Sequence, residues 1–171
     1  MNLTSEILYL GAGTGLIVNK IYKHVRKIVA VEAFEAFTKF IVQSPKIEIV
    51  NQHLLRYEPK QHFDLITAFG LMHYFDENEA IKIYKKYFEY IKPQCLMIIK
   101  NQFGIQDDVV VSGYSEEQKS NYYAQYRHID KEVQILKNIG FKNIEIVDIY
   151  PPECNRWDNT HFYAIVAQKI E

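Results

Sequence analysis

The chain has 171 residues, of which 48% are hydrophobic, and its 20 basic and 21 acidic side chains leave a formal net charge of −1. A chain of this length can bury roughly 70% of its unfolded surface in one core, so we expect a single domain over residues 1–171. The near-zero charge argues against a nucleic-acid partner, because proteins that follow phosphates carry a clustered basic excess.

The first predicted strand is an apolar run at residues 7–10, and it leads directly into a glycine-rich segment at residues 11–15, Gly-Ala-Gly-Thr-Gly. Glycines let the backbone turn sharply into a helix and approach a ligand closely. Glu32 ends a second apolar run, at residues 27–32, where a carboxylate can accept hydrogen bonds from ribose hydroxyls. This pattern predicts a nucleoside-binding crevice. Leu16 stands where a dinucleotide-binding loop needs a small residue, so an oxidoreductase that binds NAD or FAD is not favoured.

The later segments continue an alternation of helices and strands. Asp76 and Glu79 form a capping box that opens the third helix, and Gly140 stops the fourth. The last two strands have a connection too short for a crossover helix, so we expect them to be antiparallel. The predicted helices cover residues 16–24, 34–43, 77–90 and 131–138, and the later strands cover residues 46–50, 63–69, 96–99, 143–150 and 162–168.

Four motifs in this order resemble those of the class I S-adenosylmethionine-dependent methyltransferases. They are residues 10–15, Glu32, residues 63–75, and residues 90–99, which look like the family's helix end, Leu-Lys-Pro-Gly-Gly turn and fifth strand. The resemblance extends from about residue 6 to the C-terminus. It implies an α/β fold with a doubly wound, mostly parallel seven-stranded Rossmann-like sheet, helices on both faces and a C-terminal antiparallel hairpin. It also implies methyl transfer from S-adenosylmethionine, which leaves S-adenosylhomocysteine.

The resemblance assigns cofactor contacts residue by residue. The glycine-rich loop should offer its backbone to the methionine and ribose portions, and Glu32 should bind the ribose hydroxyls. Tyr9 and His53 stand where the family commonly has carboxylates, which leaves open a domain that has lost catalysis. The expected cofactor-binding residues are Tyr9, Gly11, Ala12, Gly13, Gly15, Glu32, Ala33, His53, Leu54, Ala68 and Phe69.

The stretch at residues 101–130 is irregular and rich in polar aromatic residues. We expect it to be an insertion that builds the acceptor pocket, and the alternative is a helical lid whose tyrosines pack on the core. Tyrosines can stack on rings and donate hydrogen bonds, and the Arg127 guanidinium suits a phosphate or a carboxylate. The candidate acceptor-binding residues are Tyr74, Gln102, Tyr126, Arg127 and Arg156.

Two histidines are candidate general bases for an alcohol acceptor, His73 beyond the fourth strand and His128 in the insertion. A histidine takes up a proton near neutral pH, and such a base contributes typically 10² to 10⁴-fold to the rate. His73 has an alternative interpretation as a helix-entry residue that bonds the backbone.

These features predict methylation of a small polar acceptor, at an oxygen of a sugar, a nucleotide-linked sugar or a phosphorylated metabolite in bacterial surface-polysaccharide modification. The alternatives are an N-methyltransferase of a small amine and a non-catalytic partner subunit.

Cys95 and Cys154 lack metal-ligand spacing, so we expect no metal ion. The sequence shows no signal peptide and no membrane-spanning run, so we expect a cytoplasmic protein with no membrane partner. The family's helices before the first strand are missing, and a homodimer could cover the exposed crevice.

Overall fold

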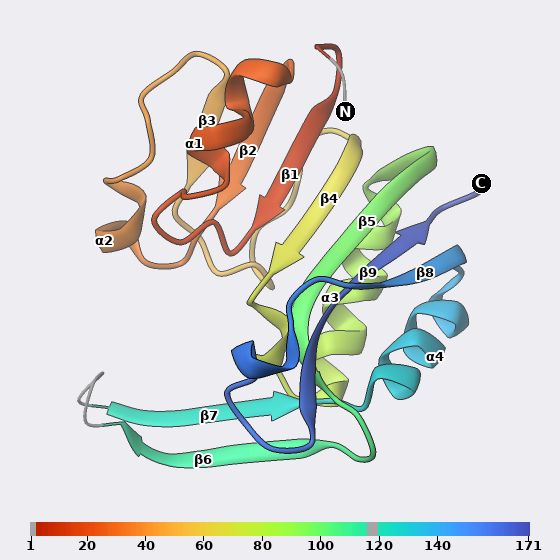
Figure 1. The fold of residues 1–171 in the computed structure, drawn as a ribbon. Coiled ribbons are helices and arrows are strands. Elements are labelled where there is room, and N and C mark those ends of the chain that lie inside the picture. Colours follow the sequence, from red (N-terminus) through yellow and green to blue (C-terminus); the bar gives the residue numbers. More distant parts are fainter. Residues whose placement is uncertain (1–2, 116–119) are drawn as a thin grey trace.

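A computed structural model describes residues 3–115 and 120–171, and its main feature is a seven-stranded sheet in the order β3-β2-β1-β4-β5-β9-β8 (Figure 1). The first five strands are parallel, β9 is antiparallel to β5, and β8 is antiparallel to β9. This topology confirms the predicted fold class. The strands are β1 (Glu6–Leu10), β2 (Lys27–Val31), β3 (Ile47–Val50), β4 (Phe63–Phe69), β5 (Ile91–Gly104), β8 (Lys142–Asp148) and β9 (Thr160–Gln168).

Two hydrophobic layers form on the opposite faces of the sheet, because successive side chains of a strand point to opposite sides. Leu8 and Leu10 of β1 join a core cluster with the long helix α3 (Glu77–Glu89) and with α4 (Ile129–Ile139). Ile7 and Tyr9 of the same strand join a second cluster with Val18 of α1 (Val18–Ile21). Tyr9 therefore lies on the α1 side of the sheet.

The two long helices have the capping residues that the sequence predicts, although α4 begins at Ile129, two residues before the predicted start. Asp76 accepts a hydrogen bond from the Glu79 backbone and the Glu79 side chain accepts one from the Asp76 backbone, which completes the capping box of α3. Gly140 ends α4 with a φ of 125°, a value that glycine adopts without strain.

The first two predicted helices are shorter than expected. Residues 16–24 form only α1 and the 3₁₀ turn η1 (Tyr22–His24), and residues 34–43 form only α2 (Glu35–Thr38). The Thr38 hydroxyl donates to the Glu35 carbonyl oxygen at 3.1 Å and meets the side chain of Asn51. Such side-chain bonds offer the backbone an alternative to further helical turns.

Residues 101–130 do not form a helical lid, so that alternative is wrong. β5 continues to Gly104, and the chain then makes a two-stranded antiparallel hairpin of β6 (Val109–Ser115) and β7 (Ser120–Tyr126). The alternation pairs Val109 with Tyr126 and Val111 with Ala124 on one face, a pattern that favours strands. Figure 1 shows this hairpin as an arm at the end of the sheet toward which β4 points, and β7 contacts the 3₁₀ turn η2 (Met72–Tyr74) that follows β4.

Candidate active site

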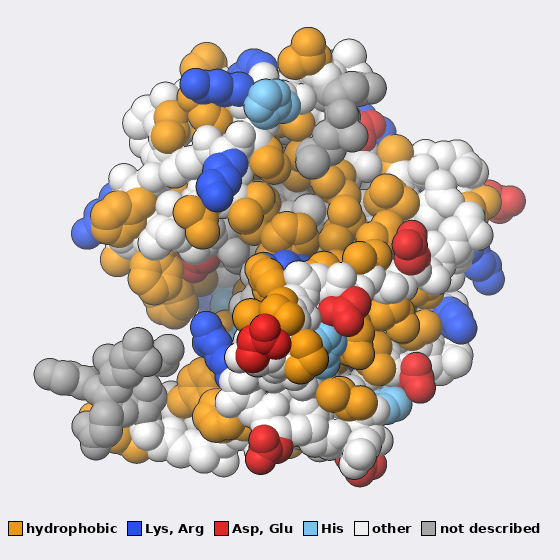
Figure 2. Space-filling model, in the orientation of Figure 1, with side chains coloured by type: hydrophobic (Ala, Val, Ile, Leu, Met, Phe, Trp, Pro, Cys, Tyr) orange, Lys and Arg blue, Asp and Glu red, His pale blue; other side chains and the backbone are white. Residues whose placement is uncertain are grey.

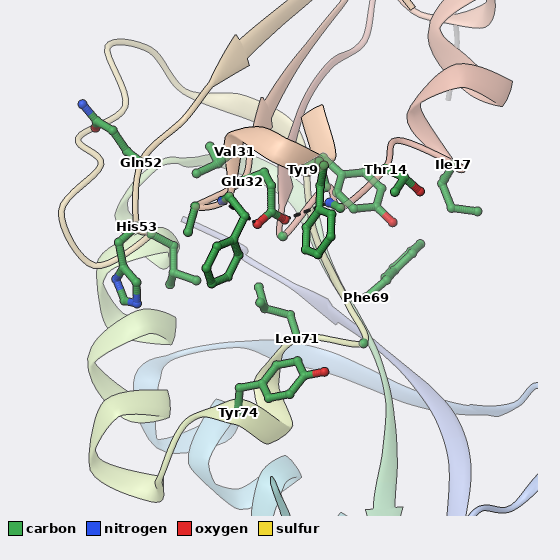
Figure 3. Close-up of a pocket in the computed structure, with 18 of the residues that line it drawn as sticks. Tyr9, Thr14, Ile17, Val31, Glu32, Gln52, His53, Phe69, Leu71 and Tyr74 are labelled. Carbon is green, nitrogen blue, oxygen red and sulfur yellow. Dashed lines mark hydrogen bonds between the residues drawn. The ribbon is translucent and has the colours of Figure 1, made fainter. Parts of the chain in front are cut away.

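A cavity of about 1000 Å³ lies at the carboxyl ends of β1, β2 and β4 (Figure 3). Ligands of open α/β sheets bind at this edge, and the volume is that of a small-molecule site. Nine of the eleven expected cofactor-binding residues line the cavity: Tyr9, Gly11, Ala12, Gly13, Glu32, Ala33, His53, Leu54 and Phe69.

The other two expected residues do not line the cavity. Ala68 is fully buried in the core, among the side chains on the α3 side of the sheet. Gly15 lies against Ile41, whose Cγ1 would come within 2.5 Å of an added Cβ. Ala68 is therefore part of the sheet beneath the site, and Gly15 is part of the packing that supports the loop.

The glycine-rich loop closes around the carboxylate of Glu32. Gly11 and Gly13 have φ values of 67° and 54°, which side chains rarely tolerate, and a Cβ on Gly11 would meet the Leu71 side chain at 2.8 Å. One oxygen of Glu32 accepts from the Gly13 backbone at 2.9 Å and the other from the Phe34 backbone at 3.0 Å. A carboxylate has about four acceptor sites, so Glu32 keeps capacity for a ligand.

The cavity wall next to β1 is aromatic and uncharged. Tyr9 and Phe69 pack edge to face with ring centroids 5.5 Å apart, and both line the cavity. Burial raises the pKa of the Tyr9 phenol, so the side chain is neutral at physiological pH. Tyr9 thus provides an aromatic ring and an uncharged hydroxyl group to this wall of the cavity.

His53 lies at the other side of the cavity, after β3. Its Nδ1 atom accepts from the Leu55 backbone at 3.3 Å, and its ring meets the edge of Phe75 with centroids 6.0 Å apart. Because Nδ1 accepts, the neutral ring carries its proton on Nε2. His53 therefore offers a hydrogen-bond donor to a ligand.

Beside the cavity, five side chains from three segments form what we call the aromatic cluster: His73, Tyr74, Tyr122, Tyr126 and Trp157. The His73 ring lies 4.1 Å from that of Tyr74 and stacks on Tyr126 at 5.3 Å. Tyr126 shares hydrogen bonds with the Tyr122 hydroxyl at 2.9 Å and with Trp157 Nε1 at 3.1 Å. Tyr74 also lines the cavity, so it joins the cluster to the cofactor region.

His73 is half-buried, and its Nδ1 atom lies 2.8 Å from Asn101 Oδ1. Burial lowers the pKa of His73, and the charges of Arg127 and Arg156 lower it further, against the opposing effect of the Asn101 bond. The imidazole is therefore neutral at pH 7.

Arg156, in the connection between β8 and β9, is exposed and makes no ion pair within the described part of the chain. Its charge acts on the aromatic cluster: burial raises the pKa of Tyr74 and of Tyr122, and Arg156 opposes that rise at both. The Arg156 guanidinium therefore lies beside the aromatic cluster without an ion-pair partner among the described residues.

Three residues expected at the acceptor site lie elsewhere. Arg127 is buried, its Nε atom is 2.5 Å from Glu132 Oε2, and it donates to the carbonyl oxygens of Phe75 and Met72. Gln102 is buried and donates to the Thr160 hydroxyl. His128 precedes α4, where its Nε2 lies 2.7 Å from the Ile105 carbonyl oxygen. A buried guanidinium needs a charged partner. Arg127 therefore stabilises the protein interior through its pair with Glu132 and does not face the acceptor.

The sequence interpretation missed several cavity residues that have no chemical signature. Phe34 and Phe37 follow Glu32, and Gly70, Leu71 and Phe75 follow β4. Only their position in the sequence could have identified them as cavity residues, because each follows the carboxyl end of a parallel strand. Within residues 3–115 and 120–171, no group of three His, Cys, Asp or Glu side chains could hold a metal ion, and no helix is long and apolar enough to cross a membrane.

A family model described as a methyltransferase domain matches residues 7–94, just over half of the chain. The chain belongs to this methyltransferase family. With the Rossmann-like fold, the match identifies the enzyme as an S-adenosylmethionine-dependent methyltransferase. Comparison with curated proteins gives no sequence match.

Solved structures of methyltransferases are similar to the whole chain in fold. An S-adenosylmethionine-dependent methyltransferase from Listeria monocytogenes superposes with a TM-score of 0.81 at 14% identity, over 99% of this chain and 92% of that chain. The 1,6-didemethyltoxoflavin-N1-methyltransferase of Burkholderia thailandensis gives 0.76 at 12% identity, over 98% and 72%. The N-methyltransferase NodS of Bradyrhizobium japonicum, in complex with S-adenosylhomocysteine, gives 0.72 at 14% identity, over 98% and 79%.

Proposed function

We propose that this methyltransferase binds S-adenosylmethionine in the cavity and methylates an oxygen of a small acceptor that carries an anionic group. The proposal of an anionic acceptor rests on Arg156. Its guanidinium has no ion pair among the described residues and lies beside an aromatic cluster that adjoins the cavity. A guanidinium fork suits phosphate or carboxylate, and tyrosine rings suit a sugar or a base.

The cavity residues fit the cofactor. Glu32 has acceptor capacity for ribose hydroxyls, and an added Cβ at Gly13 would meet nothing within 4 Å, which leaves room for a ligand against the loop. His53 would donate a hydrogen bond to a ring nitrogen of the adenine. Tyr9 and Phe69 would face the positively charged methionine portion, which aromatic rings attract. When bound, S-adenosylmethionine supplies an electrophilic methyl group.

The chain's own residues would then position the acceptor and take its proton. Arg156 would hold the anionic group, and Tyr74 and Tyr122 would hold the body of the acceptor near the cavity. Much of the barrier reduction comes from this positioning. His73 would act as the general base toward a hydroxyl, because it is neutral at pH 7 and adjoins Tyr74. Phosphorylated and nucleotide-linked sugars, such as the precursors of bacterial surface polysaccharides, satisfy these requirements.

A second candidate is N-methylation of a small amine or heterocycle. The Burkholderia and Bradyrhizobium enzymes are N-methyltransferases, and the aromatic cluster could stack on a planar ring. A neutral amine attacks through its own lone pair, so N-methylation would depend little on His73. His73→Gln should therefore reduce O-methylation strongly and N-methylation weakly.

The first experiment is calorimetric titration of the purified chain with S-adenosylmethionine, S-adenosylhomocysteine and, as a control, NAD. We expect binding of the first two and none of NAD. Acceptor screening follows, with phosphorylated and nucleotide-linked sugars beside matched neutral sugars. Methylation of neutral sugars at equal kcat/KM would contradict the anionic acceptor, and the absence of S-adenosylmethionine binding would contradict the cofactor site.

A further inference from the structure

Asn101 and His73 meet at the edge of the aromatic cluster. His73 belongs to η2, whereas Asn101 lies on β5, just past the end of β4, and pairs with Tyr163 of β9. The Asn101 side chain is buried, and its Oδ1 atom lies 2.8 Å from His73 Nδ1. A rigid strand thus holds one specific nitrogen of the histidine.

This contact determines where the imidazole proton resides. An amide oxygen only accepts hydrogen bonds, so its partner nitrogen must carry a proton. A neutral imidazole carries one ring proton, and with that proton on Nδ1 the lone pair lies on Nε2. Within the described chain no other hydrogen bond to the His73 ring is found, so Nε2 remains able to accept a proton.

The charged groups around His73 favour its neutral form. Arg127 from the end of β7 and Arg156 from the β8–β9 connection both oppose protonation. The rings of Tyr74 and Tyr126 contact the imidazole, and burial raises the pKa of the Tyr74 phenol, so that side chain adds no negative charge. Asn101 itself is uncharged, so it orients the ring without stabilising the imidazolium as an aspartate would.

We propose that Asn101 is the positioning residue that holds His73 in the Nδ1-protonated tautomer and so makes Nε2 the basic nitrogen of the methyl-transfer site. This inference rests on the proposed function of His73 as the base. An asparagine at this position gives a base that is oriented like the histidine of an Asp-His pair and remains deprotonated at neutral pH.

The tautomer can be measured in the unaltered protein by ¹⁵N NMR of the histidine side chains at pH 8. The chain has six histidines, and His73→Gln identifies the signals of His73 by their loss. We expect a protonated Nδ1 and an unprotonated Nε2. A proton on Nε2 would overturn the inference, whether or not an acceptor has been found.

Two substitutions at residue 101 then distinguish a role of Asn101 in orienting the His73 ring from a role in packing alone. Asn101→Leu should mix the tautomers and lower kcat about 10-fold to 100-fold, a part of what a positioned base contributes, with the affinity for S-adenosylmethionine unchanged. Asn101→Asp should keep the proton on Nδ1 and move the acidic limb of the kcat/KM profile upward by about one pH unit or more, because a nearby carboxylate raises the pKa of His73.

Gln102→Leu is the matched control, because Gln102 is equally buried on the same strand but bonds Thr160. It should leave the His73 tautomer unchanged. An unchanged tautomer and kcat in Asn101→Leu, or an unmoved pH profile in Asn101→Asp, would overturn the inference. Failure of the proposed function itself would appear separately, as a His73→Gln variant that methylates the acceptor at the normal rate.

Discussion

At the scale of single residues, the cofactor site depends on the Glu32 carboxylate, which bridges the Gly13 and Phe34 backbone groups. We expect Glu32→Ala to weaken S-adenosylmethionine binding by about 1–3 kcal/mol through loss of charge-assisted hydrogen bonds. Calorimetry measures this loss, and Glu35→Ala, an exposed carboxylate on α2, is the control. An unchanged affinity in Glu32→Ala would remove Glu32 from the site.

A substitution of Arg156 tests whether the acceptor is anionic. Arg156→Ala should raise the KM for an anionic acceptor by about 10-fold to 100-fold, because a hydrogen bond to a charged group is worth about 1.5–3 kcal/mol, and should leave the cofactor affinity unchanged. Arg26→Ala, in an exposed arginine paired with Glu6, is the control. An equal rise in KM for a neutral acceptor would contradict recognition of the anionic group.

At the scale of elements, the Arg127–Glu132 ion pair joins the end of β7 and α4 to the η2 turn. Tyr84 of α3 donates to the same carboxylate, and Arg127 reaches the carbonyl oxygens of Met72 and Phe75. This network holds the turn that carries His73 and Tyr74. Arg127 and Glu132 are five residues apart, but their partners Met72, Phe75 and Tyr84 lie more than 40 residues earlier in the chain, so the sequence pattern does not show that Arg127 is buried.

Arg127→Met should therefore lower the free energy of unfolding by about 3–5 kcal/mol, because it leaves Glu132 buried and unpaired. Urea denaturation measures the loss. The double variant Arg127→Met/Glu132→Leu should recover much of it, since no uncompensated charge remains. A single variant as stable as the wild type would contradict the structural role of the pair.

At the scale of the whole molecule, the two faces of the sheet are covered unequally. Hydrophobic side chains gather over β1, β4 and β5 on the face away from α3 and α4 (Figure 2). Leu96 and Ile98 of β5 are only partly buried there. The homodimer expected from the sequence stays a prediction, which sedimentation equilibrium of the purified chain would check.

The whole domain should gain stability from its cofactor. Ligand at 100 times its Kd adds about 2.7 kcal/mol, which for a domain of this size raises Tm by about 5–11 °C. Differential scanning calorimetry with S-adenosylmethionine measures this rise. NAD at the same concentration should give none, and an equal effect of both would contradict specific binding.

Most of the fold could be predicted because its signals are local. Apolar runs mark the parallel strands, the Gly-Ala-Gly-Thr-Gly segment and Glu32 mark the nucleoside crevice, and the capping box marks the start of α3. Each of these depends on neighbours within a few residues or on the shared carboxyl edge of a parallel sheet. The predicted lengths of the first two helices were wrong, and for the second helix one reason is that a side-chain bond such as that of Thr38 is not visible in a periodic pattern.

The sequence by itself thus determined the family resemblance, the mostly parallel sheet with its antiparallel C-terminal hairpin, and most of the cofactor cavity. Only the tertiary structure decided that Arg127 lies in the interior, that Arg156 stands free beside the aromatic cluster, and that Asn101 holds His73. These outcomes depend on burial and on partners from distant segments. The desolvation that makes a buried charge or imidazole depend on its partners arises only when the chain is packed.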